Sequence, residues 1–248
     1  MKIVQISDCH LFADLHKCGY NQINPFDSLQ QVLHDVKTQQ PDRLIVTGDL
    51  SGDASKQSYQ HFSALLQDCH IDCPISILLG NHDCQDSLSA HFSASQLWQT
   101  TSPILLNHDW CMHLLNSQSQ GTKGFITAED LAALALQLQT YPKAYHVIAV
   151  HHHPIACGGW MDKHEWVNRK AFTDLLARFS HVKAVVHGHI HMDIEQQQNG
   201  CVYLACPSTC WQWANTQEFV VSDLAPGYRV INLAENGQIR TSVFRLNG

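Results

Sequence analysis

Five apolar runs in this sequence are each followed at once by aspartate, asparagine or histidine. The side chains at these places are Asp8, His10, Asp49, Asn81, His82, His151, His189 and His191. All of them present oxygen or nitrogen donors, and none presents sulfur. Carboxylate, amide and imidazole groups in this mixture suit Mn, Fe or Zn, whereas Mg rarely takes so many imidazoles. The residue types therefore predict a metal centre.

Eight donor groups are too many for a single ion. Two ions that share one carboxylate would use them, and in two-metal sites the ions lie about 3.5–4 Å apart. Such a pair activates a bridging water, orients phosphate oxygens and stabilises the attacking and leaving oxygens of an in-line displacement. The chemistry expected of these residues is hydrolysis of a phosphoester.

The donors follow segments that are predicted to be buried strands. These strands span residues 2–7, 43–47, 74–79, 144–150 and 183–187, with further strands at 104–107 and 110–116 and helices at 25–41, 55–68, 86–91, 127–139 and 165–179. In open α/β sheets the ligand site lies outside the carboxyl ends of the strands. Asp8 and His10 are two residues apart in a segment read as extended, so both are expected to point to one face.

After His191 the pattern changes to short alternating runs separated by turn signals. The runs span residues 193–197, 201–205, 218–222, 228–233 and 238–244, and Asn-Gly or Pro-Gly pairs separate several of them. This pattern predicts hairpins and a second, largely antiparallel sheet. The expected fold is α/β: a four-layer α/β/β/α sandwich of two stacked mixed sheets flanked by helices. Residues 1–248 are expected to form a single domain, with the motifs in 8–191 and antiparallel strands in 193–245.

Composition limits the partners. The chain has 248 residues, a formal charge of -7 and no run of Lys or Arg, which argues against binding of long nucleic acid. It has no apolar run of the roughly 18 residues that a membrane span requires, and the sequence after Met1 reads as a strand and not as a signal peptide. The expected location is the cytoplasm. Ten cysteines without a C-x-x-C pair are expected to be reduced and mostly buried.

The motifs resemble a known family when they are taken together. Asp8-x-His10, Gly48-Asp49, Gly80-Asn81-His82-Asp83, His151-His152-x-Pro154 and Gly188-His189-x-His191 are similar to the motif set of the calcineurin-like metallophosphoesterases. Within that superfamily the sequence most resembles the bacterial class III 3′,5′-cyclic-AMP phosphodiesterases. The supporting segments are Asp8-Cys9-His10-Leu11-Phe12, Ser58-Tyr59-Gln60-His61-Phe62, the three histidines before Pro154 and Pro207-Ser208-Thr209-Cys210.

The resemblance implies a role for each residue. Asp8, His10, Asp49 and His191 would hold one metal ion, and Asp49, Asn81, His151 and His189 would hold the other, with Asp49 as the bridge. His82 would contact the phosphate and act as the general acid that protonates the leaving O3′ oxygen. The residues implied to contact substrate are His10, Asp49, Asn81, His82, His151 and His191. The ions would be Fe or Mn, with Zn also possible.

The substrate implied by the resemblance is cyclic AMP, and the product is 5′-AMP. The alternatives are another phosphodiester or monoester, such as a glycerophosphodiester or a 2′,3′-cyclic nucleotide, and a metal-binding scaffold without turnover. The loop 155–164 and the segment 207–213 are expected to choose the substrate. No membrane or long nucleic acid is expected as a partner, and the oligomeric state is open, with a homodimer possible.

Several single residues have a second reading. Asn81 could be a turn former, His82 could orient substrate without giving a proton, and His152 could replace His151 as the ligand. Asp53, Asp83 and Asp162 could either orient ligand histidines or shape loops. Trp160, Trp211 and Trp213 could stack on a purine or simply pack.

Overall fold

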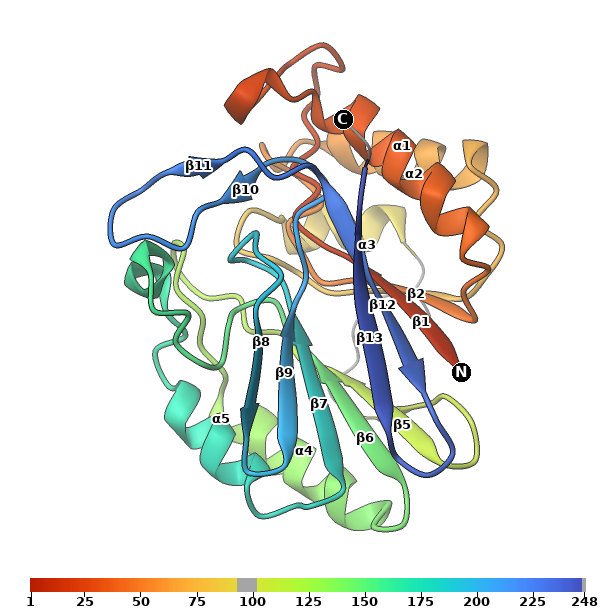
Figure 1. Ribbon diagram of the computed structural model, residues 1–248, viewed down its shortest axis with the longest axis vertical. Coiled ribbons are helices and arrows are strands. Elements are labelled where there is room, and N and C mark those ends of the chain that lie inside the picture. Colours follow the sequence, from red (N-terminus) through yellow and green to blue (C-terminus); the bar gives the residue numbers. More distant parts are fainter. Residues whose placement is uncertain (93–101, 247–248) are drawn as a thin grey trace.

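Two sheets stack face to face in the computed structural model, which describes residues 1–92 and 102–246 (Figure 1). In spatial order, the first sheet contains β13 (Ile239–Arg245), β12 (Gly227–Leu233), β1 (Lys2–Ile6), β2 (Arg43–Val46) and β3 (Ile75–Ile77). The second contains β4 (Ile104–Leu105), β5 (Trp110–Leu114), β6 (Tyr145–Ala149), β7 (Val182–His187), β9 (Cys201–Ala205) and β8 (Glu195–Gln198). A short ribbon pairs β10 (Gln212–Trp213) with β11 (Val221–Ser222).

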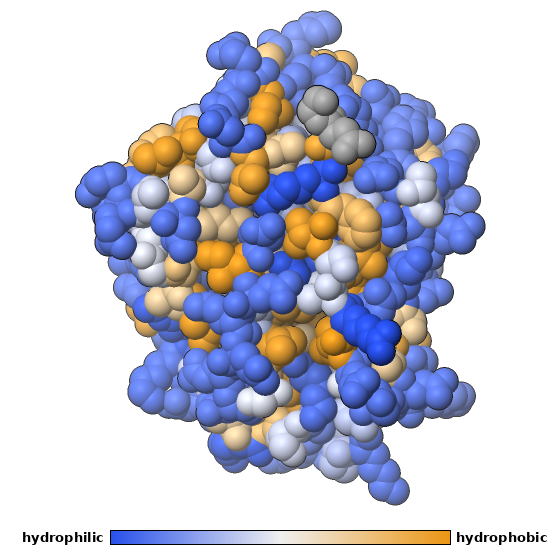
Figure 2. All heavy atoms as spheres, in the orientation of Figure 1, coloured by the Kyte–Doolittle hydropathy of each residue, from blue (hydrophilic) through white to orange (hydrophobic). Residues whose placement is uncertain are grey.

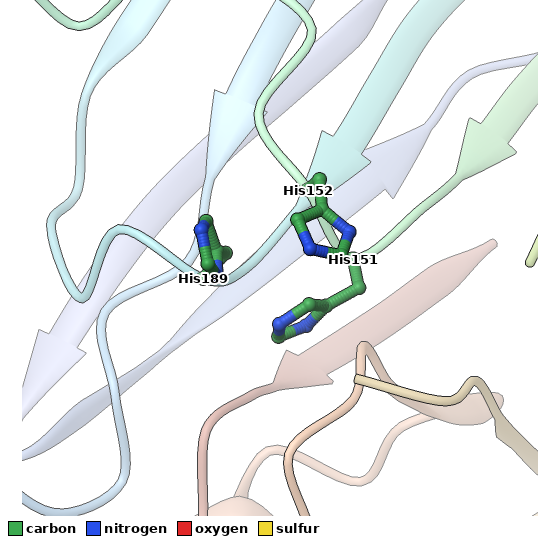
Figure 3. A group of neighbouring side chains, drawn as sticks. All are labelled: His151, His152 and His189. Carbon is green, nitrogen blue, oxygen red and sulfur yellow. The ribbon is translucent and has the colours of Figure 1, made fainter. Parts of the chain in front are cut away.

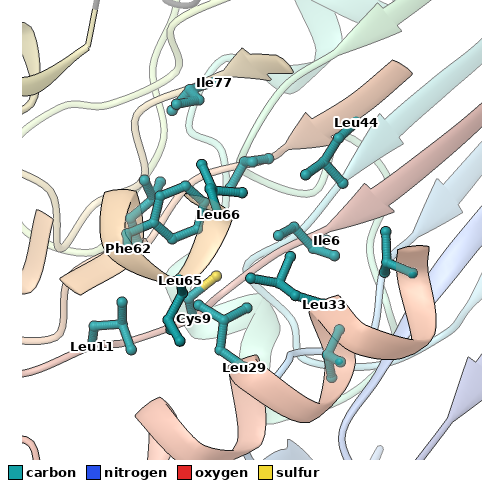
Figure 4. Close-up of a cluster of buried hydrophobic side chains, with 14 of the residues drawn as sticks. Ile6, Cys9, Leu11, Leu29, Leu33, Leu44, Phe62, Leu65, Leu66 and Ile77 are labelled. Carbon is teal, nitrogen blue, oxygen red and sulfur yellow. The ribbon is translucent and has the colours of Figure 1, made fainter. Parts of the chain in front are cut away.

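The helices lie on the outer faces of the two sheets. They are α1 (Pro25–Thr38), α2 (Lys56–Asp68), α3 (Gln85–His91), α4 (Ala128–Thr140) and α5 (Arg169–Leu176), with 3-10 turns η1 (Tyr20–Gln22) and η2 (Trp160–His164). Side chains of α1 and α2 pack on the first sheet in one apolar cluster, part of which is drawn in Figure 4. A second cluster joins α4 and α5 to the second sheet. The predicted four-layer sandwich is therefore confirmed.

The strands at the centre carry apolar groups on both faces. On β1, Val4 and Ile6 pack against the helices, whereas Ile3 packs against the other sheet. On β7, Val185 faces the helices and Ala184 faces the first sheet. Strands buried on both faces read as continuous apolar runs, which is why these segments could be recognised in the sequence.

The expectation that the tail forms the second sheet by itself was wrong. Strands β12 and β13 extend the first sheet, where β12 runs antiparallel to β1. Strand β9 runs parallel to β7 in the second sheet, and β5, β6 and β7 are parallel to one another. Turn sequences predict which neighbouring strands form a hairpin. They do not predict which sheet edge the hairpin pairs with, because this depends on the edges that the rest of the fold leaves free.

The start of the last helix was also placed wrongly. Residues 165 and 166 run beside Gly124, Gly124 and Trp166 form a bridge, and the chain turns at residues 167 and 168. The side chain of Asn168 accepts from the N–H of Ile126 and donates to the C=O of Ile126. These contacts keep the segment out of the helix, so α5 begins only at Arg169. By contrast, three of the other helices begin where they were predicted, and the side chains of Asn24, Ser55 and Thr127 accept hydrogen bonds from their first turns.

All ten cysteines are free thiols, and most of them are buried, as predicted. Among the described residues, no helix is both long enough and apolar enough to span a membrane. Polar residues cover most of the molecular face in Figure 2, and apolar residues form separate patches between them.

A chain of neutral histidines is buried at one end of the second sheet. His146 Nε2 donates to the C=O of Tyr141 (3.0 Å), so its Nδ1 must accept from His113 Nε2 (2.7 Å). His113 Nδ1 lies 2.8 Å from Gln137 Oε1, and the direction of this contact depends on the tautomer of His113 and on which way the amide is turned. Burial lowers the pKa of both imidazoles to about 4.

We expect these two histidines to make the fold sensitive to acid. The unfolded imidazoles bind protons below about pH 6.5, whereas the folded ones stay neutral down to about pH 4. The stability they contribute is complete above pH 6.5 and is lost as the pH falls through this window, by on the order of 3 kcal/mol per histidine. Urea unfolding with chelator present, at pH 7 and pH 4, measures this loss. The double variant His113→Gln, His146→Gln should lose less, and an equal loss in both proteins would contradict the assignment.

Candidate metal centre

The loops that follow β1, β2, β3, β6 and β7 meet at one edge of the two sheets. Backbone hydrogen bonds join the first two loops, from Asp8 N to Gly48 O (3.0 Å) and from His10 N to Asp49 O (2.9 Å). The loops after β6 and β7 are joined by the bond from Gly188 N to His151 O (3.1 Å). Gly80 lies so close to the Asp49 carboxylate that a Cβ at position 80 would collide with it. The structure thus brings together all the side chains predicted to bind metal.

The backbone at these residues is not extended, contrary to expectation. Strand β1 ends at Ile6, and Asp8 and His10 have φ of 55° and 48°. Asp49, His189 and His191 also have positive φ, at 52°, 69° and 49°. Residues other than glycine rarely adopt this left-handed backbone conformation, and strained conformations of this kind are more frequent at functional sites. Asp8 and His10 converge because of these turns and not because of strand alternation.

One group of donors consists of Asp8, His10 and His191. Their donor atoms all lie within 4.8 Å of one another. His191 Nδ1 donates to the C=O of Trp211 (2.8 Å), which leaves a lone pair on His191 Nε2. That nitrogen lies 3.1 Å from His10 Nε2 and 3.5 Å from Asp8 Oδ1. Burial lowers the pKa of His10 to about 3, so its imidazole is neutral.

A second group surrounds His151. Its Nδ1 donates to the C=O of Thr47 (2.7 Å), which leaves Nε2 to face Asn81 Oδ1 (3.1 Å) and Asp49 Oδ2 (3.4 Å). His189 Nε2 donates to the C=O of His164 (3.1 Å), so the free nitrogen of His189 is Nδ1. Figure 3 shows the rings of His151, His152 and His189 gathered where the loops after β6 and β7 meet.

Asp49 lies between the two groups. Its Oδ2 is 3.4 Å from His151 Nε2 and 3.9 Å from His10 Nε2. Burial would raise the pKa of Asp49, but the positive charge of His151 holds it below its usual range. Burial likewise lowers the pKa of His151, but the Asp49 carboxylate outweighs it and raises the pKa to about 9. Without a cation, a proton is therefore shared at this pair, and a metal ion must displace it.

Both groups consist of imidazole nitrogens with carboxylate or amide oxygens, the donor types that Mn, Fe and Zn bind. His10 and His191 lie beside the carboxylate of Asp8, and His151 and Asn81 lie beside the carboxylate of Asp49. Protons shared within such groups, as between His151 and Asp49, are displaced when a cation binds. The residues therefore fit two metal ions, with Asp49 positioned to contact both.

His82 lies next to this centre. Its backbone N–H donates to Asp49 Oδ1 (2.7 Å), which leaves the imidazole exposed, with its centroid 5.0 Å from that of His10. The ring lines a cavity of about 440 Å³ that also reaches Asp49, Asn81, His189 and His191. A ring nitrogen of His82 also lies within 4.8 Å of ligand atoms of His10 and Asp49, so the ring stands at the edge of the centre, where it can contact a bound ligand.

Three aspartates that could have oriented ligand histidines contact other groups instead. Asp83 is buried and accepts the N–H groups of Gly80 (2.9 Å) and Ser51 (3.0 Å), so it ties the loops after β2 and β3 together. Asp53 accepts from the N–H of Ala13 and of Ser55, which shapes the loop before α2. Asp162 faces His153 and none of the predicted metal ligands.

Sequence reasoning missed the groups that orient the ligands. The histidine protons are received by the backbone carbonyls of Thr47, His164 and Trp211, which no motif marks. The sequence predicts that His152 packs behind the ligands or orients them, with replacement of His151 as the ligand as the alternative. Its Nδ1 is hydrogen-bonded to Ser117 Oγ (2.8 Å), but its buried Nε2 has no hydrogen-bond partner among the described residues and lies in the group with His151 and His189. The run of three histidines, 151–153, was the sequence feature that could have indicated a role for His152 beside the metal ligands.

Aromatic rings form one side of the cavity, which we call the aromatic wall. It consists of Tyr20, Trp160, Trp211, Trp213 and Phe219. Trp211 stacks on His10 and Trp213 on His191, with centroids 5.3 and 4.8 Å apart, so the wall adjoins the metal centre. Tyr20 and Phe219 remain half exposed. The segments 155–164 and 207–213 both contribute to this wall, as their predicted role in substrate choice requires.

Comparisons with known proteins agree with this geometry. The family model for "Calcineurin-like phosphoesterase" matches residues 1–193. The 3′,5′-cyclic adenosine monophosphate phosphodiesterase CpdA of Escherichia coli K12 is 33% identical over 251 residues, covering 99% of this chain and 90% of that protein. The protein of the same name from Vibrio vulnificus is 34% identical over 251 residues, with the same coverage of both chains.

A solved structure shows the same architecture. A dimetal phosphatase from Danio rerio superposes with a TM-score of 0.70 and 14% identity, covering 93% of this chain and 94% of that one. This likeness concerns the fold, whereas the family match and the relatives in Escherichia coli and Vibrio vulnificus rest on sequence. The chain belongs to the calcineurin-like phosphoesterase family.

Proposed function

We propose that this protein is a di-metal phosphodiesterase that hydrolyses 3′,5′-cyclic AMP to 5′-AMP. The observation that carries the proposal is the convergence of six side chains with oxygen or nitrogen ligand atoms around the shared carboxylate of Asp49, directly beside a cavity with an aromatic wall. The relatives named as cyclic AMP phosphodiesterases support the choice of substrate. The proposed ions are Fe or Mn, with Zn as the alternative.

The proposed ligands fall into two sets that share Asp49. Asp8, His10 and His191 complete one set, and Asn81, His151 and His189 complete the other. When bound, a pair of cations supplies Lewis-acid activation of water and neutralises charge on the phosphate. The side chains position the ligand atoms. The imidazoles that donate one N–H to a backbone carbonyl direct their other nitrogen toward the centre, and Asn81 places its amide oxygen beside His151.

His82 is proposed to handle the leaving group. In hydrolysis a water oxygen forms a new bond to phosphorus while the bond from phosphorus to O3′ breaks. The sugar oxygen then carries negative charge and needs a proton, which an adjacent imidazolium can give. His82 is exposed to the cavity and has its backbone fixed on Asp49, so its ring can reach an oxygen on phosphate held by this centre.

The aromatic wall is proposed to hold the adenine. Its rings offer flat apolar faces, and Trp160 Nε1 is a buried donor without a hydrogen-bond partner in the described residues. An adenine ring offers both a face for stacking and nitrogen acceptors for such a donor. The described residues that line the cavity include no Lys or Arg, which favours a neutral base over a second anionic group.

The test of the function is a substrate panel. Protein loaded with Mn or Fe should hydrolyse 3′,5′-cyclic AMP with a higher kcat/KM than 2′,3′-cyclic AMP, glycerophosphocholine or 5′-AMP, and a chelator should stop the reaction. A higher kcat/KM for one of the other esters would replace cyclic AMP as the proposed substrate. Metal binding without turnover of any ester would establish a non-catalytic scaffold.

Removal of one ring of the aromatic wall should weaken binding of the adenine base without slowing hydrolysis of the phosphoester. Phe219→Ala is expected to raise KM for cyclic AMP about 5- to 150-fold, since one base–aromatic contact is worth about 1–3 kcal/mol in stacking sites. Hydrolysis of bis(p-nitrophenyl) phosphate, which has no purine, should change less than twofold. Phe244→Ala, which removes a similarly exposed phenyl ring on β13, is the matched control. Equal losses on both substrates would show that Phe219 only supports the loop.

We also propose that residues 1–248 act as one domain. Strands β12 and β13 complete the sheet that begins with β1, and Trp211 near the C-terminal part stacks on His10 near the start. Neither the sheet nor the cavity is complete without both parts of the chain.

A further inference from the structure

A third group of metal-ligating side chains lies outside the two sets that share Asp49. It consists of His153, Cys157 and Asp162, whose donor atoms lie within 4.8 Å of one another. Asp162 Oδ1 is 3.3 Å from His153 Nε2 and 3.5 Å from Cys157 Sγ. None of these residues belongs to the proposed ligand sets or to the aromatic wall.

The two separations from Asp162 match those of a tetrahedral zinc site. With Zn–N and Zn–O bonds of about 2.0–2.1 Å and Zn–S bonds of about 2.3 Å, a tetrahedral angle places N and O about 3.3 Å apart and S and O about 3.5 Å apart. Zinc is commonly bound by this combination of imidazole, thiolate and carboxylate.

His153 provides an independent reason to expect a ligand. Its side chain is fully buried, and neither ring nitrogen makes a hydrogen bond of good geometry within the described residues, although Nε2 lies 3.3 Å from Asp162 Oδ1. Buried imidazole nitrogens normally have a partner, because leaving one without any costs about 1–3 kcal/mol. A cation bound at Nε2 would satisfy the nitrogen that faces Asp162.

The carboxylate of Asp162 is already oriented for this role. Oδ1 accepts from the N–H of Cys157 (2.9 Å), and Oδ2 accepts from the N–H of Gly158 (2.9 Å). Hydrogen bonds to a ligating carboxylate are the usual second layer of a metal site. The Asp162 side chain is 28% exposed, which gives a cation a way in and leaves room for a water as fourth ligand.

A reactive cysteine is a poorer explanation of the same cluster. Burial raises the pKa of the Cys157 thiol to about 11, so the free thiol is protonated at neutral pH and is a weak nucleophile. Metal coordination, in contrast, deprotonates a thiol outright.

We propose that His153, Cys157 and Asp162 bind a third metal ion, of the Zn²⁺ class, separate from the pair at Asp49. Binding releases the thiol proton of Cys157 to solvent and forms three protein–metal bonds. The ion fixes the segment 157–162 to the end of β6, and this segment carries Trp160 of the aromatic wall. The proposal does not depend on the phosphodiesterase activity.

Cobalt provides a specific test because the centre at Asp49 contains no sulfur. When Co²⁺ is titrated into the full-length protein, a thiolate-to-cobalt charge-transfer band should appear in the near ultraviolet. Its final intensity should correspond to one thiolate-bound cobalt ion per chain. Cys157→Ser should abolish that band and lower the zinc content, measured by elemental analysis, by one equivalent. Cys18→Ser, which removes an exposed thiol, should leave both unchanged.

A second variant covers the case in which Cys157→Ser fails to fold. Asp162→Asn leaves the Cys157 thiol in place and keeps one side-chain oxygen that can accept a backbone N–H, but it removes the negative charge. This variant should weaken cobalt binding at the thiolate site more than tenfold. Absence of the band in the wild-type protein, or a band that persists unchanged in Cys157→Ser or Asp162→Asn, would show that the cluster is only a hydrogen-bonded loop and overturn the proposal.

Discussion

Replacement of Asp49 by asparagine is expected to lower kcat/KM for cyclic AMP by on the order of 10³-fold or more. Asp49 is the carboxylate that lies within reach of both donor groups, so its charge serves both proposed ions. The amide keeps the shape and can still accept the N–H of His82, but it supplies no negative charge. The same variant should bind fewer than two metal ions per chain by elemental analysis.

The control is Asp53→Asn, four residues further along the same loop. Its carboxylate bonds to the N–H of Ala13 and of Ser55 and lines no part of the cavity. This variant should keep both metal content and kcat/KM within about threefold. An Asp49→Asn protein with full metal content and undiminished turnover would eliminate the shared-carboxylate mechanism.

Replacement of His82 by alanine is expected to lower kcat for cyclic AMP by about 10²–10⁴-fold while the metal content stays unchanged. The exposed imidazole contributes no bond that holds the loop, because the link to Asp49 is made by the backbone N–H. His34→Ala, on the exposed face of α1, serves as the control for loss of a surface histidine.

The leaving group distinguishes proton donation from substrate binding. A p-nitrophenolate leaves without a proton, so the His82→Ala defect should shrink to less than about tenfold with bis(p-nitrophenyl) phosphate. An equal defect with both substrates would mean that His82 orients the phosphate. A defect accompanied by loss of metal would make His82 a ligand.

Much of the fold could be predicted because the strands that hold the site are buried on both faces. Segments such as Val4 to Ile6 and Val185 to Val186 need apolar side chains toward a helix layer and toward the other sheet. The helices were marked by the side-chain caps Asn24, Ser55 and Thr127. These are local signals, which the sequence contains directly.

The tail could not be predicted to the same degree. Its hairpins were visible, but β12 was expected in a sheet of its own and instead lies beside β1. Asn168 ties the segment before α5 to Ile126, a residue 42 positions earlier, and keeps that segment out of the helix. Contacts at such distances along the chain depend on the assembled fold and leave no periodic pattern.

The sequence by itself determined which donors are present, that they follow buried strands, and the family to which they belong. Only the tertiary structure decided which lone pair each histidine directs inward, because carbonyls of Thr47, His164 and Trp211 receive the other ring proton. It also decided the left-handed turns at Asp8 and His10, and the approach of His153 to Asp162. Residue type sets what a group can bind, but the direction in which it points is fixed by neighbours from distant parts of the chain.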